Sequence, residues 1–205
     1  MCLGERDPSY DLVCLCLPRG NGKSTLAAWL GARLLFDYRM GKQSHIIAAS
    51  VGQARRTTFK LLREYIDNED KDFRVSDNIS GASVTHKETN TKVAVLAANH
   101  KTAQGLVDVP VIICDEPGAW DVNSGTAVWD AIETAQGKPG MSMKIILIGT
   151  LAPNGIEGSW WHKLVKGGSH GTTYVQVLQA DHKKWEDEAE IERVNPLMWL
   201  SLIHI

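Results

Sequence analysis

The chain has 205 residues and a formal net charge of −2, with 43% hydrophobic and 22% charged residues. This composition is ordinary for a globular protein and excludes a chain that is disordered throughout. The small net charge gives no overall attraction to nucleic acid or anionic lipid, so any contact with DNA must come from a local patch.

The cysteines and histidines give no support to a disulfide framework or a zinc site. The four cysteines contain no C-x-x-C pair, and two of them, Cys14 and Cys16, fall inside a predicted core strand. The seven histidines show no H-x-x-H spacing. No stretch approaches the ~20 apolar residues of a membrane-spanning helix, and the N-terminus lacks the regions of a signal peptide. We therefore expect a cytoplasmic protein with reduced thiols.

A buried strand, a loop and a helix follow one another near the N-terminus. The apolar run Leu12–Leu17 predicts a strand buried on both faces. Pro18 ends it, and Arg19–Gly22 forms a flexible loop. Lys23–Thr25 then opens a helix whose leucines recur at helical spacing, namely Leu26, Leu30 and Leu34.

This arrangement predicts a phosphate-binding loop of the Walker A type. Backbone N–H groups of the loop and the positive end of the helix dipole can surround phosphate oxygens. Lys23 would reach the β and γ phosphates, and the Ser24 hydroxyl would bind Mg²⁺. Leu17 stands where the usual motif has its first glycine. The predicted nucleotide contacts are Pro18, Arg19, Gly20, Asn21, Gly22, Lys23, Ser24 and Thr25.

The next segments predict a strand and an amphipathic helix. The first helix should end near Gly41, and His45–Ala49 should form a strand. Gln53–Asn68 has the apolar period of a helix, with basic residues on the opposite face at Arg56, Lys60 and Arg63. A solvated face is the preferred interpretation of these three residues, and contact with DNA or a neighbouring subunit is the alternative.

The remainder predicts a small hairpin and then alternating strands and helices. Ala82–His86 and Lys92–Ala97 would pair through a turn at Glu88–Thr91. Further predicted elements are the strand Val109–Cys114, helix Thr126–Gln136, strand Met143–Ile148, helix Ser159–Lys166 and strand Tyr174–Leu178. Strands that alternate with helices indicate a mostly parallel sheet in an α/β fold.

We expect one domain over residues 1–180. Residues 181–205 read as a charged linker that is broken at Asn195-Pro196 and followed by an apolar, truncated or foreign end.

Two further strand ends carry candidate catalytic residues. The strand before Cys114 is followed by Asp115 and Glu116, at the sheet edge where open α/β proteins bind ligands. Asp115 would hold Mg²⁺ through water, and Glu116 would polarise the water that attacks the γ-phosphate. Thr150 follows another buried strand. If that strand lies between the other two, Thr150 faces the γ-phosphate and can sense hydrolysis.

The segments LPRGNGKST, IIAASVGQARRTTF, AANHKTAQGL before VIICDE, and IGTLAP resemble the ATPase domain of the large terminase subunit, the DNA-packaging motor of tailed phages. The resemblance implies a P-loop NTPase of the additional-strand catalytic glutamate type, a three-layer α/β/α sandwich. It also implies ATP and Mg²⁺ as cofactors, a γ-phosphate contact for Arg19, and a role for Thr150 in coupling hydrolysis to motion.

The same resemblance implies biological context. Such motors move double-stranded DNA into a procapsid as a homo-oligomeric ring, with a portal protein and a small terminase subunit, in the cytoplasm of the infected host. Family members also carry a nuclease domain, and we expect this chain to stop before it.

Several other nucleotide-binding classes fit less well or stay open. A GTPase would need an N-K-x-D guanine reader, which is absent, and a small-molecule kinase uses no Asp-Glu pair to activate water. A helicase-like DNA-dependent ATPase and a catalytically idle nucleotide-binding assembly module remain alternatives. The arginine supplied to a neighbouring subunit is not assigned.

Overall fold

The computed structural model describes residues 10–36, 41–66, 71–78, 81–99, 106, 109–137, 143–150 and 159–178. The expected linker and apolar end beyond residue 180, the loop that follows Thr150, and most of the AANHKTAQGL segment lie outside the described residues.

The described chain alternates strands and helices, largely in the predicted order. The strands are β1 (Leu12–Cys16), β2 (Gln43–Ala48), β3 (Phe73–Asn78), β4 (Gly81–His86), β5 (Lys92–Ala97), β6 (Val111–Asp115), β7 (Lys144–Gly149) and β8 (Thr173–Val177). The helices are α1 (Lys23–Leu35), α2 (Val51–Arg56), α3 (Thr58–Ile66), α5 (Val122–Gln136) and α6 (Trp160–Gly167), with a short 3-10 helix η2 (Pro117–Ala119).

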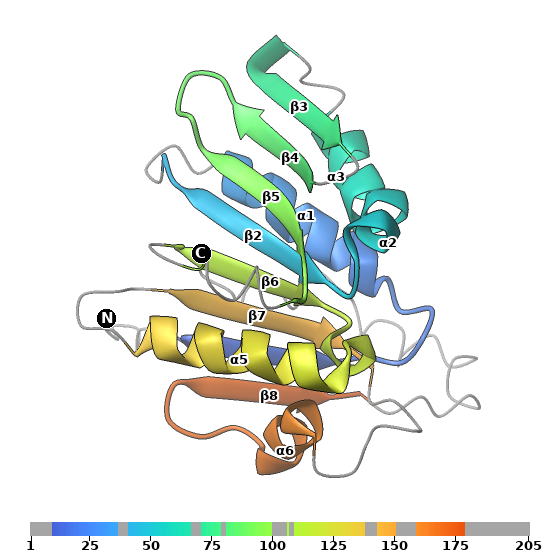
Figure 1. The fold of residues 1–205 in the computed structure, drawn as a ribbon, viewed down its shortest axis with the longest axis vertical. Helices are drawn as coiled ribbons and strands as arrows, with labels where there is room; N and C mark the ends of the chain where they lie inside the picture. Colours follow the sequence, from blue (N-terminus) through green and yellow to red (C-terminus); the bar gives the residue numbers. More distant parts are fainter. Residues whose placement is uncertain are drawn as a thin grey trace, which may run out of the picture.

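All the strands join one eight-stranded sheet in the order β3-β4-β5-β2-β6-β7-β1-β8 (Figure 1). Neighbouring strands from β5 to β8 pair in parallel. Only β4 runs the other way, antiparallel to β3 and to β5. The mostly parallel α/β fold with a hairpin at its edge is confirmed, and β7 lies between β6 and β1 as the interpretation of Thr150 required.

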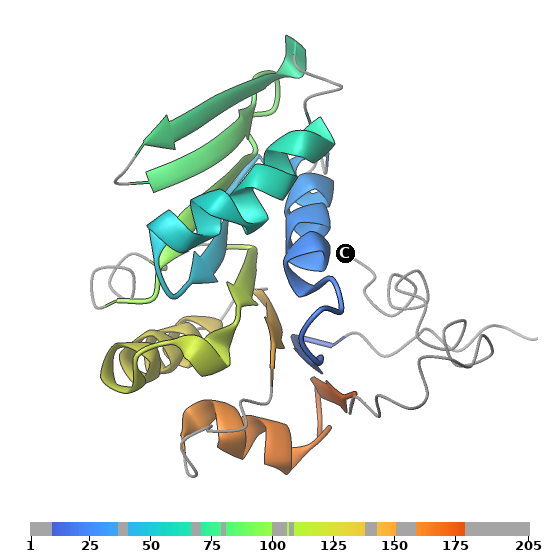
Figure 2. The ribbon, with the colours of Figure 1, turned by 90° about the vertical axis from the view of Figure 1, so that its right-hand side faces the viewer.

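Helices cover both faces of the sheet because successive strand residues point to opposite sides. In β1, Val13 and Leu15 pack into a core shared with α1 and α3. Leu12 and Cys14 pack into a second core, shared with α5 and α6. Figure 2 shows α1 and α5 on opposite sides of the sheet. The three-layer arrangement is therefore confirmed.

The backbone of α1 approaches the sheet closely at Gly31. A Cβ atom there would lie 3.1 Å from Cδ1 of Ile46 on β2. A side chain at this position would crowd Ile46 where α1 meets β2, and α1 is the helix that begins at Lys23, directly after the predicted phosphate loop.

The prediction of one continuous helix over Gln53–Asn68 is wrong. The helix is interrupted at Thr57, whose φ of −116° and ψ of −96° are not helical, and α3 begins at the next residue. The Thr57 hydroxyl donates to the Gln53 carbonyl at 3.1 Å, a bond that threonines also form inside the continuous helix α5. Arg56 therefore lies on a different helix from Lys60 and Arg63.

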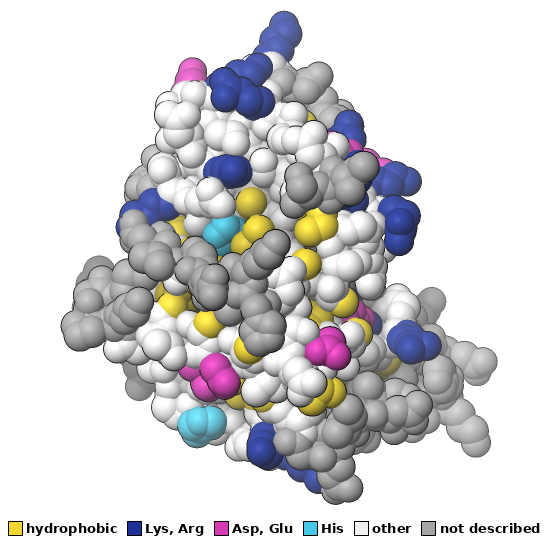
Figure 3. All heavy atoms as spheres, in the orientation of Figure 1, with side chains coloured by type: hydrophobic (Ala, Val, Ile, Leu, Met, Phe, Trp, Pro, Cys, Tyr) yellow, Lys and Arg dark blue, Asp and Glu magenta, His cyan; other side chains and the backbone are white. Residues whose placement is uncertain are grey.

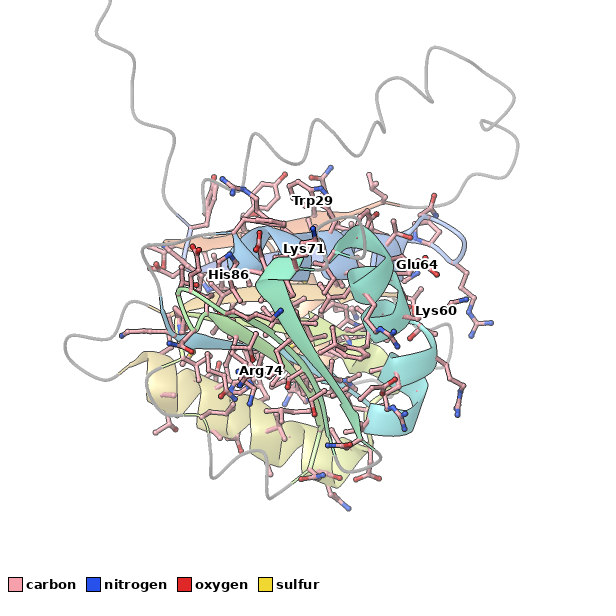
Figure 4. The ribbon with its side chains drawn as sticks, turned by 90° about the horizontal axis from the view of Figure 1, so that it is seen from above. Trp29, Lys60, Glu64, Lys71, Arg74 and His86 are labelled. Atoms are coloured by element: carbon pink, nitrogen blue, oxygen red, sulfur yellow. The ribbon has the colours of Figure 1, made fainter. Side chains whose placement is uncertain are left out.

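Two of the three basic residues of that segment have acidic partners. Lys60 lies 3.7 Å from Glu64 on the same helix, where Figure 4 labels both side chains. Arg63 lies 3.5 Å from Asp77 on β3, and Arg55 lies 2.5 Å from the same carboxylate. These ion pairs favour the solvated interpretation over a free basic face.

Smaller differences concern the ends of elements and one strand. Helix α5 begins at Val122, earlier than predicted, because the Asp121 side chain accepts a hydrogen bond from the Ser124 N–H and caps the helix. Strand β3 was not predicted, because FRVSDN has few apolar residues.

The charged groups are distributed unevenly over the surface. In Figure 3 many of the Lys and Arg side chains lie in the upper part of the molecule, where β3 and β4 are, and acidic side chains are seen both there and lower, around α5. No helix among the described residues is both long and apolar enough to span a membrane.

Candidate nucleotide-binding site

The loop between β1 and α1 depends on two glycines in left-handed conformations. Gly20 has a φ of +83° and Gly22 a φ of +66°, values that residues with a Cβ rarely adopt. Gly22 is the N-cap of α1, and no side chain of the described residues caps this helix start. The first N–H groups of α1 are therefore available to an anion, in agreement with the predicted phosphate loop.

Lys23 is the first residue of α1 and is nearly buried, with 6% of its side chain exposed. Its Nζ donates to the Pro18 carbonyl at 2.8 Å. The same Nζ lies 3.3 Å from Oε1 of Glu116. Lys23 thus connects the start of the loop with the residue that follows β6.

Glu116 adopts a left-handed conformation, with φ 51° and ψ 55°, immediately after β6. Its N–H donates to the Ile148 carbonyl of β7 at 2.8 Å. Its Oε2 accepts from both the N–H and the Oγ1 of Thr150, each at 3.0 Å. The turn after β6 therefore holds the Glu116 carboxylate between Lys23 and Thr150. Its Oε1 contacts Lys23, and its Oε2 accepts the two hydrogen bonds from Thr150.

Asp115 is the last residue of β6 and is 5% exposed. Burial raises the pKa of its carboxyl group, the Thr58 hydrogen bond opposes that rise, and the charges of Glu116 and Lys23 act in opposite directions. The Thr58 hydroxyl donates to Oδ2, whereas Oδ1 is buried and has no hydrogen-bond partner among the described residues. Such an oxygen is suited to a cation, because a buried carboxylate oxygen is costly to leave unpaired.

Two tryptophans donate hydrogen bonds to backbone carbonyls at the ends of β6 and β7. The Trp120 indole N–H donates to the Asp115 carbonyl at 3.2 Å, and that of Trp161 donates to the Thr150 carbonyl at 3.1 Å. Trp160 stacks on Trp129 of α5, with ring centroids 4.6 Å apart and planes 7° apart. This cluster of four tryptophans connects η2, α5 and α6 to the site.

Close packing beneath these tryptophans requires a glycine at the end of β7. A Cβ atom on Gly149 would lie 2.9 Å from Cδ of Pro117 and 3.1 Å from Cζ2 of Trp161. The absence of a side chain at Gly149 thus permits the end of β7 to pack directly against Pro117 and Trp161.

The structure brings four of the predicted site residues together, namely Lys23, Asp115, Glu116 and Thr150. Ser24 follows Lys23 in α1 and is half-buried. The side chains of Arg19 and Thr25 are exposed, and no described residue forms an ion pair with the Arg19 guanidinium. The Asn21 side-chain amide donates to the Arg19 carbonyl at 3.4 Å.

Sequence reasoning missed Thr58, Trp120 and Trp161. Adjacent β-branched residues at Thr57 and Thr58, in the middle of a helical pattern, are a weak sign of a helix interruption. Nothing in the sequence connects the second threonine to Asp115, which lies 57 residues away. The tryptophan contacts have no sequence signal that we can identify.

Comparisons with known proteins agree with this geometry at the level of the fold. No family model matches the chain, and no curated protein matches it in sequence. The solved ATPase domain of the large terminase from Thermus phage P74-26 matches with a TM-score of 0.57 over 92% of this chain and 83% of that chain, at 17% identity. This chain has the fold of a phage large terminase ATPase domain.

Two further large terminases share this terminase fold. The enzyme of bacteriophage HK97 matches with a TM-score of 0.64 and 24% identity over 86% of this chain and 38% of that chain. The enzyme of a thermophilic bacteriophage, solved in complex with ADP, matches with a TM-score of 0.52 and 12% identity over 69% of this chain. That match spans 34% of the length of the thermophilic phage enzyme.

Proposed function

We propose that this chain binds ATP with Mg²⁺ and hydrolyses it, as the ATPase domain of a phage terminase large subunit. The observation that supports this best is the contact of Lys23 with Glu116, which Thr150 holds from the neighbouring strand. A lysine at a phosphate loop and a carboxylate that can activate water are two of the groups on which ATP hydrolysis depends.

Lys23 and Glu116 would change partners when nucleotide binds. Lys23 would exchange its contact with Glu116 for oxygens of the β and γ phosphates. Glu116 would still accept hydrogen bonds from Thr150, and would be free to polarise a water molecule and accept its proton. The two 3.0 Å bonds make Thr150 the residue through which a change at Glu116 would reach β7 and the loop beyond it.

Ser24 and Asp115 are the residues that would hold Mg²⁺. The unpartnered Oδ1 of Asp115 fits this role, directly or through water, and a serine hydroxyl at this point of a phosphate loop is an ordinary Mg²⁺ ligand. Bound Mg²⁺ would supply positive charge to the phosphate oxygens. The loop residues Pro18 to Thr25 would surround the phosphates, with Arg19 directed to the γ-phosphate.

The proposal extends to the role of the domain in a larger machine. Residues 1–180 would form the ATPase domain, with residues 181–205 as a linker and end. Hydrolysis would drive double-stranded DNA into a procapsid in the cytoplasm of an infected host, in a ring of subunits with a portal protein and a small terminase subunit. The three structural matches support this context, because each is a large terminase or its ATPase domain.

Substitution of Lys23 tests the nucleotide site. Lys23→Ala should abolish ATP binding measured by titration calorimetry in the presence of Mg²⁺, because the loop loses its only lysine. Lys163→Ala, at an exposed position on α6, is the matched control and should bind as the unmodified protein does. Unchanged ATP affinity in a folded Lys23→Ala variant would contradict the phosphate-loop assignment.

Two further assays separate the alternatives. Release of inorganic phosphate from ATP distinguishes an ATPase from an idle binding module. Strand separation of a short duplex would indicate a helicase-like enzyme, whereas movement along intact duplex, measured with the full motor, would indicate a packaging ATPase.

A further inference from the structure

The carboxylate of Asp115 has two oxygens in different situations. Oδ2 accepts the hydrogen bond from the Thr58 hydroxyl. Oδ1 is buried, and no described residue offers it a hydrogen bond. Because the whole residue is 5% exposed, bulk water does not compensate for the missing partner. The carboxylate thus has one oxygen that is fixed by a hydrogen bond and one buried oxygen without a partner among the described residues.

Thr58 is placed firmly enough to fix that carboxylate. It is the first residue of α3 and is fully buried, with 0% exposed. The three other buried residues of this helix, Phe59, Leu62 and Ile66, belong to the core shared with α1. The hydroxyl therefore comes from a helix that is packed on the sheet, not from a loop.

The same helix pair is also tied to the far edge of the sheet. Arg55 of α2 and Arg63 of α3 both contact the Asp77 carboxylate of β3, at 2.5 Å and 3.5 Å. Thr58 lies between them in the chain, immediately after the interruption at Thr57. The position of Thr58 is thus defined from the core and from β3.

We propose that Thr58 positions Asp115 for Mg²⁺ by holding Oδ2, which leaves Oδ1 as the oxygen that faces the metal or its bound water. Thr58 would be a positioning residue, because its hydroxyl acts through its hydrogen bond to Asp115. This inference rests on the proposed function, in which Asp115 belongs to a Mg²⁺–ATP site. Outer hydrogen bonds of this kind fix the orientation of a metal-binding carboxylate and increase its affinity.

Two pairs of variants isolate the hydroxyl group. Thr58→Val replaces the hydroxyl group with a methyl group at nearly the same volume. Thr58→Ser and Thr58→Ala both lack the methyl group of threonine and differ from each other only in the hydroxyl group. The measurement is the Mg²⁺ concentration that half-saturates binding of a fluorescent ATP analogue to each folded protein. Thr58→Val should need about 10-fold more Mg²⁺, the lower end of the effect of losing such a bond, and Thr58→Ser should stay close to the unmodified protein.

The neighbouring threonine supplies the control. Thr57 is exposed, and its hydroxyl bonds only locally to the Gln53 carbonyl. Thr57→Val should leave the Mg²⁺ requirement unchanged. If Thr58→Val does not fold, the comparison of Thr58→Ser with Thr58→Ala decides, and alanine should need about 10-fold more Mg²⁺ than serine.

The outcomes separate this inference from the proposed function. If the unmodified protein does not bind the nucleotide analogue in a Mg²⁺-dependent way, the proposed function fails. Two results would overturn only the role of Thr58 in a protein that does bind the analogue. One is that Thr58→Val needs no more Mg²⁺ than the unmodified protein, and the other is that Thr58→Ala needs no more Mg²⁺ than Thr58→Ser.

Discussion

The sheet has a parallel part, formed by β5, β2, β6, β7, β1 and β8, and a β3–β4 hairpin at its edge. Polar residues serve different purposes in these two parts. Parallel strands end at one edge, so Asp115, Glu116 and Thr150 meet Lys23 there and are held by short contacts. Strand β3 runs in the same direction, and Asp77 lies near its end, but β3 is the edge strand farthest from the phosphate loop, so the Asp77 carboxylate instead forms ion pairs with Arg55 and Arg63 at the surface. The place of a strand in the sheet, as well as its direction, therefore decides which polar residues can meet at one site.

The largest expected difference between the two parts concerns catalysis. Glu116→Gln keeps the shape of the side chain but removes the base, so hydrolysis should fall by about 10²-fold or more while ATP binding remains. Glu88→Gln, in the exposed turn between β4 and β5, should hydrolyse ATP at the unmodified rate. Phosphate release and titration calorimetry measure the two quantities. Full turnover by Glu116→Gln would place the general base elsewhere.

An added methyl group should also destabilise the parallel part more than the hairpin. Gly149→Ala at the end of β7 would place a Cβ 2.9 Å from Cδ of Pro117, and we expect it to lower the free energy of unfolding by about 1–3 kcal/mol. Gly81→Ala at the start of β4 has no atom within 4 Å of the new Cβ and should change stability little or increase it slightly. Urea denaturation of both variants checks this, and equal losses would contradict it.

His45 on β2, inside the parallel part, should make stability depend on pH. Burial, with a smaller effect of the Lys92 charge, lowers its pKa to about 4. The unfolded chain takes up a proton near pH 6.5 and the folded chain only near pH 4, so stability is lost as the pH falls through this interval. The loss by pH 5 should be about 2 kcal/mol.

The control for this prediction is His45→Gln, which has no group that titrates in this range. Denaturation curves from pH 7 to pH 4.5 should show a shallower decline for the variant than for the unmodified protein. Parallel declines would mean that the His45 pKa is not lowered by folding.

The smallest effects should come from surface ion pairs, and they should be alike in the two parts. Asp77→Asn removes the carboxylate charge from both arginine contacts of the hairpin, and Asp11→Asn weakens the 2.8 Å pair with Lys144 beside β7. Partly exposed pairs contribute little, so each variant should lose less than about 1 kcal/mol. Thermal unfolding measures this, and a large loss in Asp77→Asn alone would show that the hairpin depends on these pairs.

The sequence predicted the parallel part well because its signals are local. The apolar runs at β1, β6 and β7 gave the strands, and the residues that follow them, among them Glu116 and Thr150, could be expected at one edge. Two glycines and a lysine at the start of a helix gave the phosphate loop. The roles assigned to these residues remain predictions.

The features that the sequence did not predict depend on contacts between distant segments. Strand β3 is stabilised by pairing with β4 and by Arg55 and Arg63, since FRVSDN has little apolar pattern of its own. The bond from Thr58 to Asp115 requires the sheet order to be known first. The amphipathic pattern continues through the interruption at Thr57 and gave no sign of it.

The tryptophan cluster should respond to movement at the candidate site. Trp129, Trp160 and Trp161 have neighbouring ring centroids 4.6 Å and 6.1 Å apart, and Trp120 lies 5.9 Å from Trp160. Trp120 and Trp161 also donate to the carbonyls of Asp115 and Thr150, so a displacement of either strand end should change the surroundings of an indole in this cluster.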